Sequence, residues 1–175
     1  MLRAQRRCEE AIPEYERALA LNRNFLGALA DIGWCKLSTG PIDEVIGLVE
    51  QAIRLSPQDP NIGYRYSQIG RVRLLQSSTD EAILWLEKAR DANPGHPAFH
   101  AWLASAYALK GDAERAAGEL AKAKSLVGDA RFSSIARLKA IGDLGMAKNF
   151  RDPKISALFE TTYFAGLRKA GIPED

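Results

Sequence analysis

Cysteine is scarce in this chain of 175 residues, which contains only Cys8 and Cys35. The two share no CxxC spacing and no further cysteine lies near them, which argues against a zinc site and against a disulfide framework. A reducing cytoplasm is then the simplest location. Cys35 falls on an apolar stretch of an expected helix, without a nearby histidine in the sequence, so we expect a buried, inert thiol.

Long apolar runs and blocks of like charge are missing as well. No stretch reaches the roughly 18 apolar residues of a membrane span, and no signal-peptide pattern follows the arginines of the first ten residues. Lys and Arg number 24 against 22 Asp and Glu, for a net charge of +2, and both signs are scattered along the chain. We therefore expect neither a membrane nor a nucleic acid as a partner.

The residue patterns of catalytic and cofactor sites are also absent. His96 and His100 are four residues apart, but Pro97 places one in a loop and the other on a first helical turn, and no further ligand stands at metal-site spacing. The serine-rich segment 77–79 has neither a G-x-S-x-G setting nor a glycine cradle for phosphate. We expect no catalytic residue, no metal and no cofactor, and a stand-alone enzyme is only a remote alternative.

What the sequence does contain is a repeat. Four alanines step along the chain by 34, 37 and 34 residues, and each closes a triple that consists of Ala or Val, then Tyr, Val or Leu, then the alanine. The triples are Ala11-Tyr15-Ala18, Val45-Val49-Ala52, Ala82-Leu86-Ala89 and Ala116-Leu120-Ala123. Upstream of the last three, at a fixed offset apart from one three-residue insertion, stand Ile32-Gly33, Ile69-Gly70 and Leu103-Ala104. This pattern predicts helix pairs that approach closely at the small residues.

Together these residues resemble the tetratricopeptide repeat (TPR) family, whose 34-residue unit pairs two antiparallel helices, A and B, around W-x2-L-G-x2-Y, A-x3-F, A and a closing P. Pro57 and Pro94 stand where the closing proline belongs, while Gly128 replaces it in the last unit. The family's first aromatic position holds Leu29, Tyr66 and His100 here. The resemblance covers about residues 1 to 130 and implies an all-α fold, a right-handed α-solenoid of antiparallel helix pairs with a C-terminal capping helix.

The repeat register divides one structural domain into segments. We expect a partial unit at 1–25 with only helix B, at residues 8 to 21, then units at 26–59, 60–96 and 97–130, and a degenerate repeat with the capping helix at 131–175. The three-residue insertion belongs to the unit 60–96 and lengthens either helix A or its serine-rich turn. Because Met1 falls in the middle of a unit, we expect the chain to start inside a larger protein; the alternative is a true start with an N-terminal cap.

The last segment carries its own helix signals. Ser133 or Ser134 is expected to cap a short apolar run that ends at Ile141, after which Gly142, Gly145 and Asn149 loosen the chain. Asp152-Pro153 opens a last helix, whose Phe159 and Tyr163 we expect to cover the exposed face of the last unit. Residues 163–175 resemble the extreme C-terminus of bacterial proteins that carry a class III adenylate or guanylate cyclase domain followed by TPR units.

The TPR resemblance also implies a function, because such arrays bind extended peptides in a concave groove lined by helix A. The predicted groove residues are Trp34, Tyr64, Gln68, Arg71 and Trp102. The carboxylate clamp of chaperone-binding members is absent, since alanines and tryptophans stand at its positions. Packing against a neighbouring unit is the alternative role for both tryptophans. We therefore predict a non-catalytic scaffold for a protein or peptide, the regulatory or sensory end of a bacterial signalling protein; self-association through exposed helix faces is the alternative.

Overall fold

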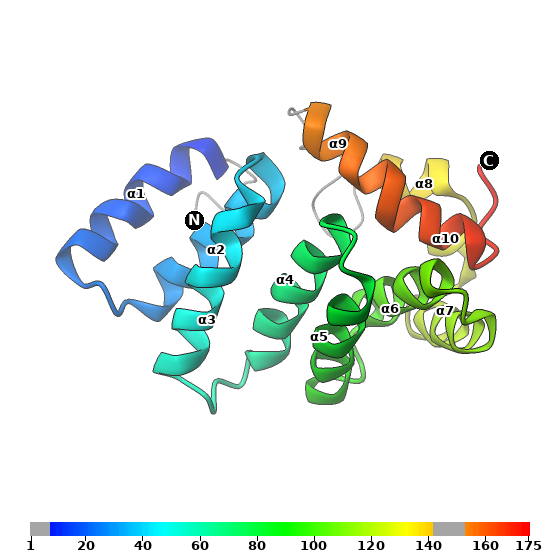
Figure 1. Cartoon of the computed structure of the whole chain (residues 1–175), viewed down its shortest axis with the longest axis horizontal. Helices are drawn as coiled ribbons and strands as arrows, with labels where there is room; N and C mark the ends of the chain where they lie inside the picture. Colours follow the sequence, from blue (N-terminus) through cyan, green and yellow to red (C-terminus); the bar gives the residue numbers. More distant parts are fainter. Residues whose placement is uncertain (1–7, 142–152) are drawn as a thin grey trace.

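The computed structural model describes residues 8–141 and 153–175, and these ranges are helical with no strand (Figure 1). The α-helices are α1 (Cys8–Leu21), α2 (Leu26–Thr39), α3 (Val45–Leu55), α4 (Ile62–Leu75), α5 (Thr79–Ala92), α6 (Pro97–Lys110), α7 (Ala113–Val127), α8 (Ile135–Ile141), α9 (Pro153–Phe159) and α10 (Ala165–Lys169). Short 3-10 segments η1 (Ile42–Glu44) and η2 (Asp129–Phe132) precede α3 and α8, and a π-helical segment, η4 (Glu160–Phe164), joins α9 to α10. None of the described helices is long and apolar enough to cross a bilayer.

The helices from α1 to α7 form a solenoid. Each packs against the next in chain order, so that α2 with α3, α4 with α5 and α6 with α7 form antiparallel pairs. The first members of these pairs also contact one another, α2 with α4 and α4 with α6, and make one layer of the array. We call the surface of this layer the concave face. The predicted α-solenoid with a C-terminal helix is confirmed.

Small residues set the distance between paired helices, as the repeat pattern predicted. A Cβ atom added at Gly70 would lie 2.6 Å from Cγ of Leu86, and one at Gly33 would lie 3.1 Å from Cγ2 of Val49. Ala89 is completely buried where α5 closes on the preceding helix. The paired helices are thus in close contact at these positions, and a larger side chain there would overpack the core.

The break between the helices of the third pair follows from the properties of one glycine and one aspartate. Gly111 has φ +88°, a left-handed conformation that glycine adopts without strain. The N–H groups of Gly111 and Asp112 return to the carbonyls of Ala108 and Tyr107, and the Asp112 side chain accepts a hydrogen bond from the Arg115 N–H. One helix is therefore closed and the next capped within two residues.

The structure shows where the three-residue insertion lies. It lies upstream of Ile69 and outside the serine-rich turn, because the spacing from Ile69 to Ala89 equals that from Leu103 to Ala123. The connection before α4 has six residues, 56–61, whereas the corresponding connections 22–25 and 93–96 have four. Helix α4 also starts seven residues before Ile69, whereas α6 starts six residues before the corresponding Leu103. The insertion therefore lengthens the connection into α4 and the first turn of that helix.

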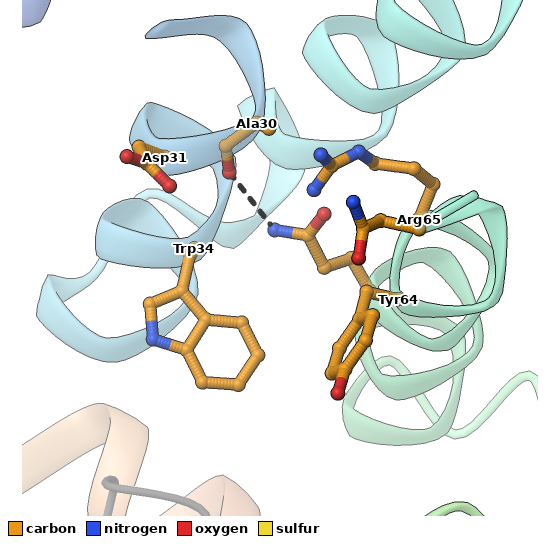
Figure 2. A pocket seen from close by; sticks show the side chains of 7 residues that line it. Ala30, Asp31, Trp34, Tyr64 and Arg65 are labelled. Carbon is orange, nitrogen blue, oxygen red and sulfur yellow. Dashed lines mark hydrogen bonds between the residues drawn. The ribbon is translucent and has the colours of Figure 1, made fainter. Parts of the chain in front are cut away.

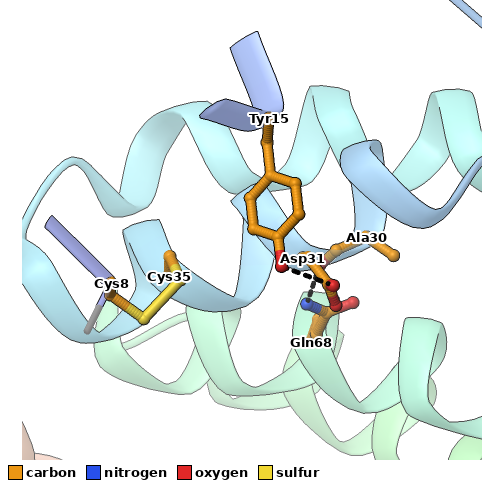
Figure 3. Close-up of a disulfide and its surroundings, with 6 residues drawn as sticks. All are labelled: Cys8, Tyr15, Ala30, Asp31, Cys35 and Gln68. Atoms are coloured by element: carbon orange, nitrogen blue, oxygen red, sulfur yellow. Dashed lines mark hydrogen bonds between the residues drawn. A yellow bond between two sulfur atoms is a disulfide. The ribbon is translucent and has the colours of Figure 1, made fainter. Parts of the chain in front are cut away.

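The expectation of two reduced cysteines is wrong. Cys8 and Cys35 form a disulfide, and the part of the chain that the structure describes holds no free cysteine (Figure 3). The bridge links residues separated by 27 positions, because α1 and α2 run antiparallel and bring the start of one beside the end of the other, with Cα atoms 5.0 Å apart. Cys8 and Ala11 form a small cluster with Cys35, separate from the main core.

The C-terminal segment begins with α8, which is capped as predicted by Ser134, whose hydroxyl accepts from the Arg137 N–H at 3.0 Å. The carbonyls of Pro173 and Glu174 accept from two further N–H groups at the start of α8, so the chain end is tied to this helix. Gly142, Gly145, Asn149 and Asp152 lie outside the described residues. A helix beginning at Pro153 is confirmed.

The last helical stretch, α9 to α10, lies across the concave face. Segment α10 packs on α6, and η4 contacts both α6 and α4, which belongs to the preceding pair (Figure 1). The expectation that this stretch covers the last unit is therefore incomplete. It also runs along the inner layer of the array, where the predicted groove residues lie.

Candidate functional site

The five predicted groove residues fall into two groups. Trp34 is half-buried on α2 and Tyr64 is 39% exposed on α4, so both line an open part of the concave face. Gln68 is 1% exposed but borders the same open part. The remaining two, Arg71 and Trp102, are buried beneath the C-terminal helix.

Arg71 joins the two groups. Its guanidinium lies 5.1 Å from the ring centroid of Trp34 and 5.1 Å from that of Trp102, so it contacts one tryptophan on each side. Cation–π contacts of this kind strengthen when the charge is shielded from water. Arg71 therefore acts here as a buried connector between α2, α4 and α6.

Trp102 takes the packing role. Its ring stacks on Tyr163 and meets Phe159 edge-on, with centroids 5.6 Å apart in the second contact. Beside it, the Ser105 hydroxyl donates a hydrogen bond of 2.8 Å to the Tyr163 carbonyl. At Gly166 the helices approach so closely that an added Cβ would lie 2.4 Å from the Ser105 carbonyl oxygen. The protein's own C-terminal helix thus occupies the concave face over α6.

An open pocket of about 410 Å³ remains between α2 and α4 (Figure 2). Its volume lies in the range of about 300–1,000 Å³ typical of ligand sites. The α2 side contributes Ala30, Asp31 and Trp34. The other side, from the inserted connection and α4, contributes Asn61, Tyr64, Arg65 and Gln68.

Hydrogen bonds hold the polar residues of this pocket in place. Tyr15 of α1 donates to the Asp31 carboxylate at 3.0 Å, and the Gln68 amide donates to the Ala30 carbonyl at 3.2 Å (Figure 3). A Cβ atom added at Gly33 would lie 3.5 Å from Nε2 of Gln68, so the absence of a side chain there leaves room for the amide. Contacts with α1 and α2 therefore hold the side chains of Asp31 and Gln68 in position before a ligand binds.

The pocket residues that the repeat register missed lie in the inserted connection or are held by it. Asp59 accepts from the Asn61 N–H at 2.9 Å and lies 3.5 Å from the Arg65 guanidinium. The repeat register gave no reason to select Asn61 and Arg65. The available signal was the insertion itself, with its Asp59-Pro60-Asn61 turn composition.

His96 and His100 do not converge on a site. His96 stacks on Phe99, with centroids 4.2 Å apart, while His100 bonds through Nδ1 to Glu119 at 2.6 Å and through Nε2 to the Pro94 carbonyl at 2.8 Å. Burial alone would lower the pKa of His100, but these hydrogen bonds outweigh it and hold the pKa above its usual 6.5. Within residues 8–141 and 153–175, no three His, Cys, Asp or Glu side chains are grouped as metal ligands.

Comparison with protein families matches residues 73–140, from the end of α4 to α8, to a tetratricopeptide repeat. The fold is that of a TPR solenoid. Solved structures agree over nearly the whole chain. MamA superposes with a TM-score of 0.63 at 20% identity, covering 96% of this chain and 93% of that one. No curated protein matched.

Two further solved TPR proteins are similar. YrrB, described as "a TPR protein with an unusual peptide-binding site", has a TM-score of 0.61 at 17% identity and covers 94% of this chain and 80% of its own. A thermophilic TPR protein of Thermus thermophilus has a TM-score of 0.61 at 20% identity, covering 97% of this chain and 86% of its own. At these identities the likeness extends to the fold and no further.

Proposed function

We propose that the protein is a non-catalytic interaction scaffold that binds a short peptide segment of a partner protein on its concave face. The observation that carries the proposal is the open pocket between α2 and α4, lined by an exposed tyrosine, a tryptophan and an arginine. Tyrosine, tryptophan and arginine are the residues most enriched at binding hot spots. Peptide binding by YrrB, which shares the fold, adds support.

The C-terminal helix restricts where the partner binds. It covers Trp102 and Arg71, so the groove over α6 is occupied and the binding surface is shorter than the whole array. Tyr64 borders the open part and packs edge-on against His96 and Phe99 at 5.1 and 5.5 Å, which fixes its ring while leaving it 39% exposed. A fixed, exposed aromatic ring is well suited to anchor a peptide.

The test is binding of an addressed array of N-acetylated, C-amidated hexapeptides, with the best sequences measured by calorimetry. We expect Tyr64→Ala to weaken binding by about 2 kcal/mol, roughly thirtyfold, as truncation of a hot-spot residue does. Leu84→Ala is the matched control, because Leu84 is an exposed apolar side chain on α5 outside the pocket. Absence of any binding peptide, or equal effects of the two variants, would overturn the proposal.

Self-association is the second candidate, favoured by two exposed apolar side chains where α1 turns into α2. Leu21 is 92% exposed and Phe25 is 47% exposed. Light scattering across a concentration series separates the candidates: a strict monomer excludes self-association, whereas a dimer that Leu21→Ser and Phe25→Ser dissolve would support it.

We also propose the wider context that the sequence suggests, with units at 26–59, 60–96 and 97–130 forming the regulatory or sensory end of a bacterial signalling protein that carries a cyclase-like domain. The support is the resemblance of residues 163–175, and the reading frame upstream of Met1 tests it. A cytoplasmic location belongs to the same proposal. It requires the Cys8–Cys35 bridge to be reversible, because disulfides in that compartment are mostly transient. Thiol alkylation before lysis would show whether the bridge exists in the cell.

A further inference from the structure

The floor of the pocket carries a buried oxygen that lacks a hydrogen-bond donor. Nε2 of Gln68 faces the Ala30 carbonyl oxygen at 3.2 Å, which assigns the amide orientation, since the reverse would place two oxygens together. Oε1 is then buried with no hydrogen-bond partner among the residues that the structure describes, and the residue as a whole is 1% exposed. Native structures seldom leave such a group unsatisfied, because the cost is about 1–3 kcal/mol.

The same pocket presents a matching donor. Arg65 lines the pocket from α4, one turn before Gln68, and its Nη2 lies 3.5 Å from Asp59. Its Nε is buried and makes no hydrogen bond to any residue in the described ranges. Two residues that line the pocket thus carry one acceptor and one donor, each in need of a partner.

The charges around the pocket favour a neutral ligand. Asp31 and Arg65 line it with opposite charges, and Arg65 is already paired with Asp59. A cationic ligand stacked on Trp34 would meet the Arg71 guanidinium, which lies 5.1 Å from that ring's centroid. An anionic ligand would meet the Asp31 carboxylate. A group with one donor, one acceptor and no charge avoids both conflicts.

The sides of the pocket favour a flat group. Trp34 on α2 and Tyr64 on α4 turn their rings toward the space between the helices (Figure 2). A peptide group is planar, uncharged, and has one N–H and one C=O. Building on the proposed function, we propose that this pocket binds a main-chain amide of a short, uncharged, extended peptide, with Gln68 Oε1 accepting from its N–H and Arg65 donating to its C=O.

The experiment uses the uncharged hexapeptide that binds the wild-type protein best, together with its series of single amide-to-ester replacements, which remove one main-chain N–H at a time. We expect one ester position to weaken binding about tenfold, the value of one hydrogen bond of about 1.4 kcal/mol. Gln68→Met, which keeps the side-chain length but removes the amide, is expected to weaken the parent peptide about tenfold and to abolish the difference between parent and ester.

Gln51→Met is the matched control, because Gln51 on α3 also donates its amide to a main-chain carbonyl, that of Arg23, but lies outside the pocket. It should bind like the wild type. If every ester is tolerated, or if the array selects Lys or Arg and Asp31→Asn removes that selection, the inference is overturned while peptide binding stands. If no peptide binds, the proposed function itself fails. The ester series depends on the wild-type protein alone, so a folding defect of Gln68→Met leaves the test decisive.

Discussion

The indole ring of Trp102 stacks on the phenol ring of Tyr163, with centroids 4.0 Å apart and planes inclined by 24°. Because of this contact between α6 and the C-terminal helix, Trp102, which was predicted as a groove residue, belongs to the buried core. It also explains why Trp102 is completely buried on the face where a peptide was expected.

Replacing Trp102 by alanine should therefore reduce stability. We expect the free energy of unfolding to fall by about 3–5 kcal/mol, the usual cost of removing a buried large aromatic side chain. Urea denaturation measures it. Trp85→Ala is the comparison, since Trp85 is half-buried on α5, and its loss should be clearly smaller. Equal losses would mean that the C-terminal helix does not cover α6 in solution.

The helix crossing at Gly166 gives an independent test of the same interface. Gly166→Ala places a methyl group against the Ser105 main chain and should destabilise the protein by about 1–3 kcal/mol. In Gly118→Ala the new Cβ meets nothing within 4 Å on the exposed side of α7, so this variant should gain about 0.5–1 kcal/mol from helix propensity. Thermal melts of the two variants should move in opposite directions, and a shift of the same sign would contradict the crossing.

The Cys8–Cys35 bridge should contribute measurably to stability. Reduction with dithiothreitol is expected to lower the free energy of unfolding by about 2–4 kcal/mol, because the bridge restricts the unfolded chain over 27 residues. The double variant Cys8→Ala, Cys35→Ala should be less stable than the oxidised protein and insensitive to the reductant. A wild-type protein that melts identically with and without dithiothreitol would show that the bridge is not formed in solution.

Stability should also depend on pH through His100. Both ring nitrogens face acceptors, Glu119 and the Pro94 carbonyl, and the pKa of His100 is raised in the folded state. Folding therefore favours the protonated imidazole of His100. Its contribution to the free energy of unfolding is complete below pH 6.5 and is lost as the pH rises through the raised pKa. We expect a loss of the order of 1 kcal/mol. Denaturation at a series of pH values should show this step in the wild type and not in His100→Gln; a step that persists would assign it elsewhere.

The repeat could be predicted from the sequence because the contacts that define it form between neighbouring helices of one pair. Gly70, Leu86 and Ala89 meet within one helix pair, so their spacing carries the geometry. The disulfide was not readable, because it depends on how α1 folds back along α2. The role of Trp102 stayed open between groove and packing, because its burial depends on a helix more than 50 residues further along the chain.

The pocket lies between these extremes. Trp34, Tyr64 and Gln68 were predicted on the concave face by the register, and the structure places all three around one space. Arg65 was missed because the repeat register gave no reason to select it. The repeat positions Pro57 and Tyr66 bracket the extra residues, but only the structure shows how these are divided between the connection 56–61 and the start of α4.

The disulfide at one end of the solenoid and the C-terminal helix at the other affect how the protein unfolds. Helical repeat arrays ordinarily fray from their terminal units, since these have a neighbour on one side only. Here the first helix is held covalently by Cys8–Cys35, and the last pair is held by a helix whose Ser105–Tyr163 hydrogen bond spans 58 residues. We therefore expect the terminal helices to separate less readily than in an untied array, and the array to melt as one cooperative block.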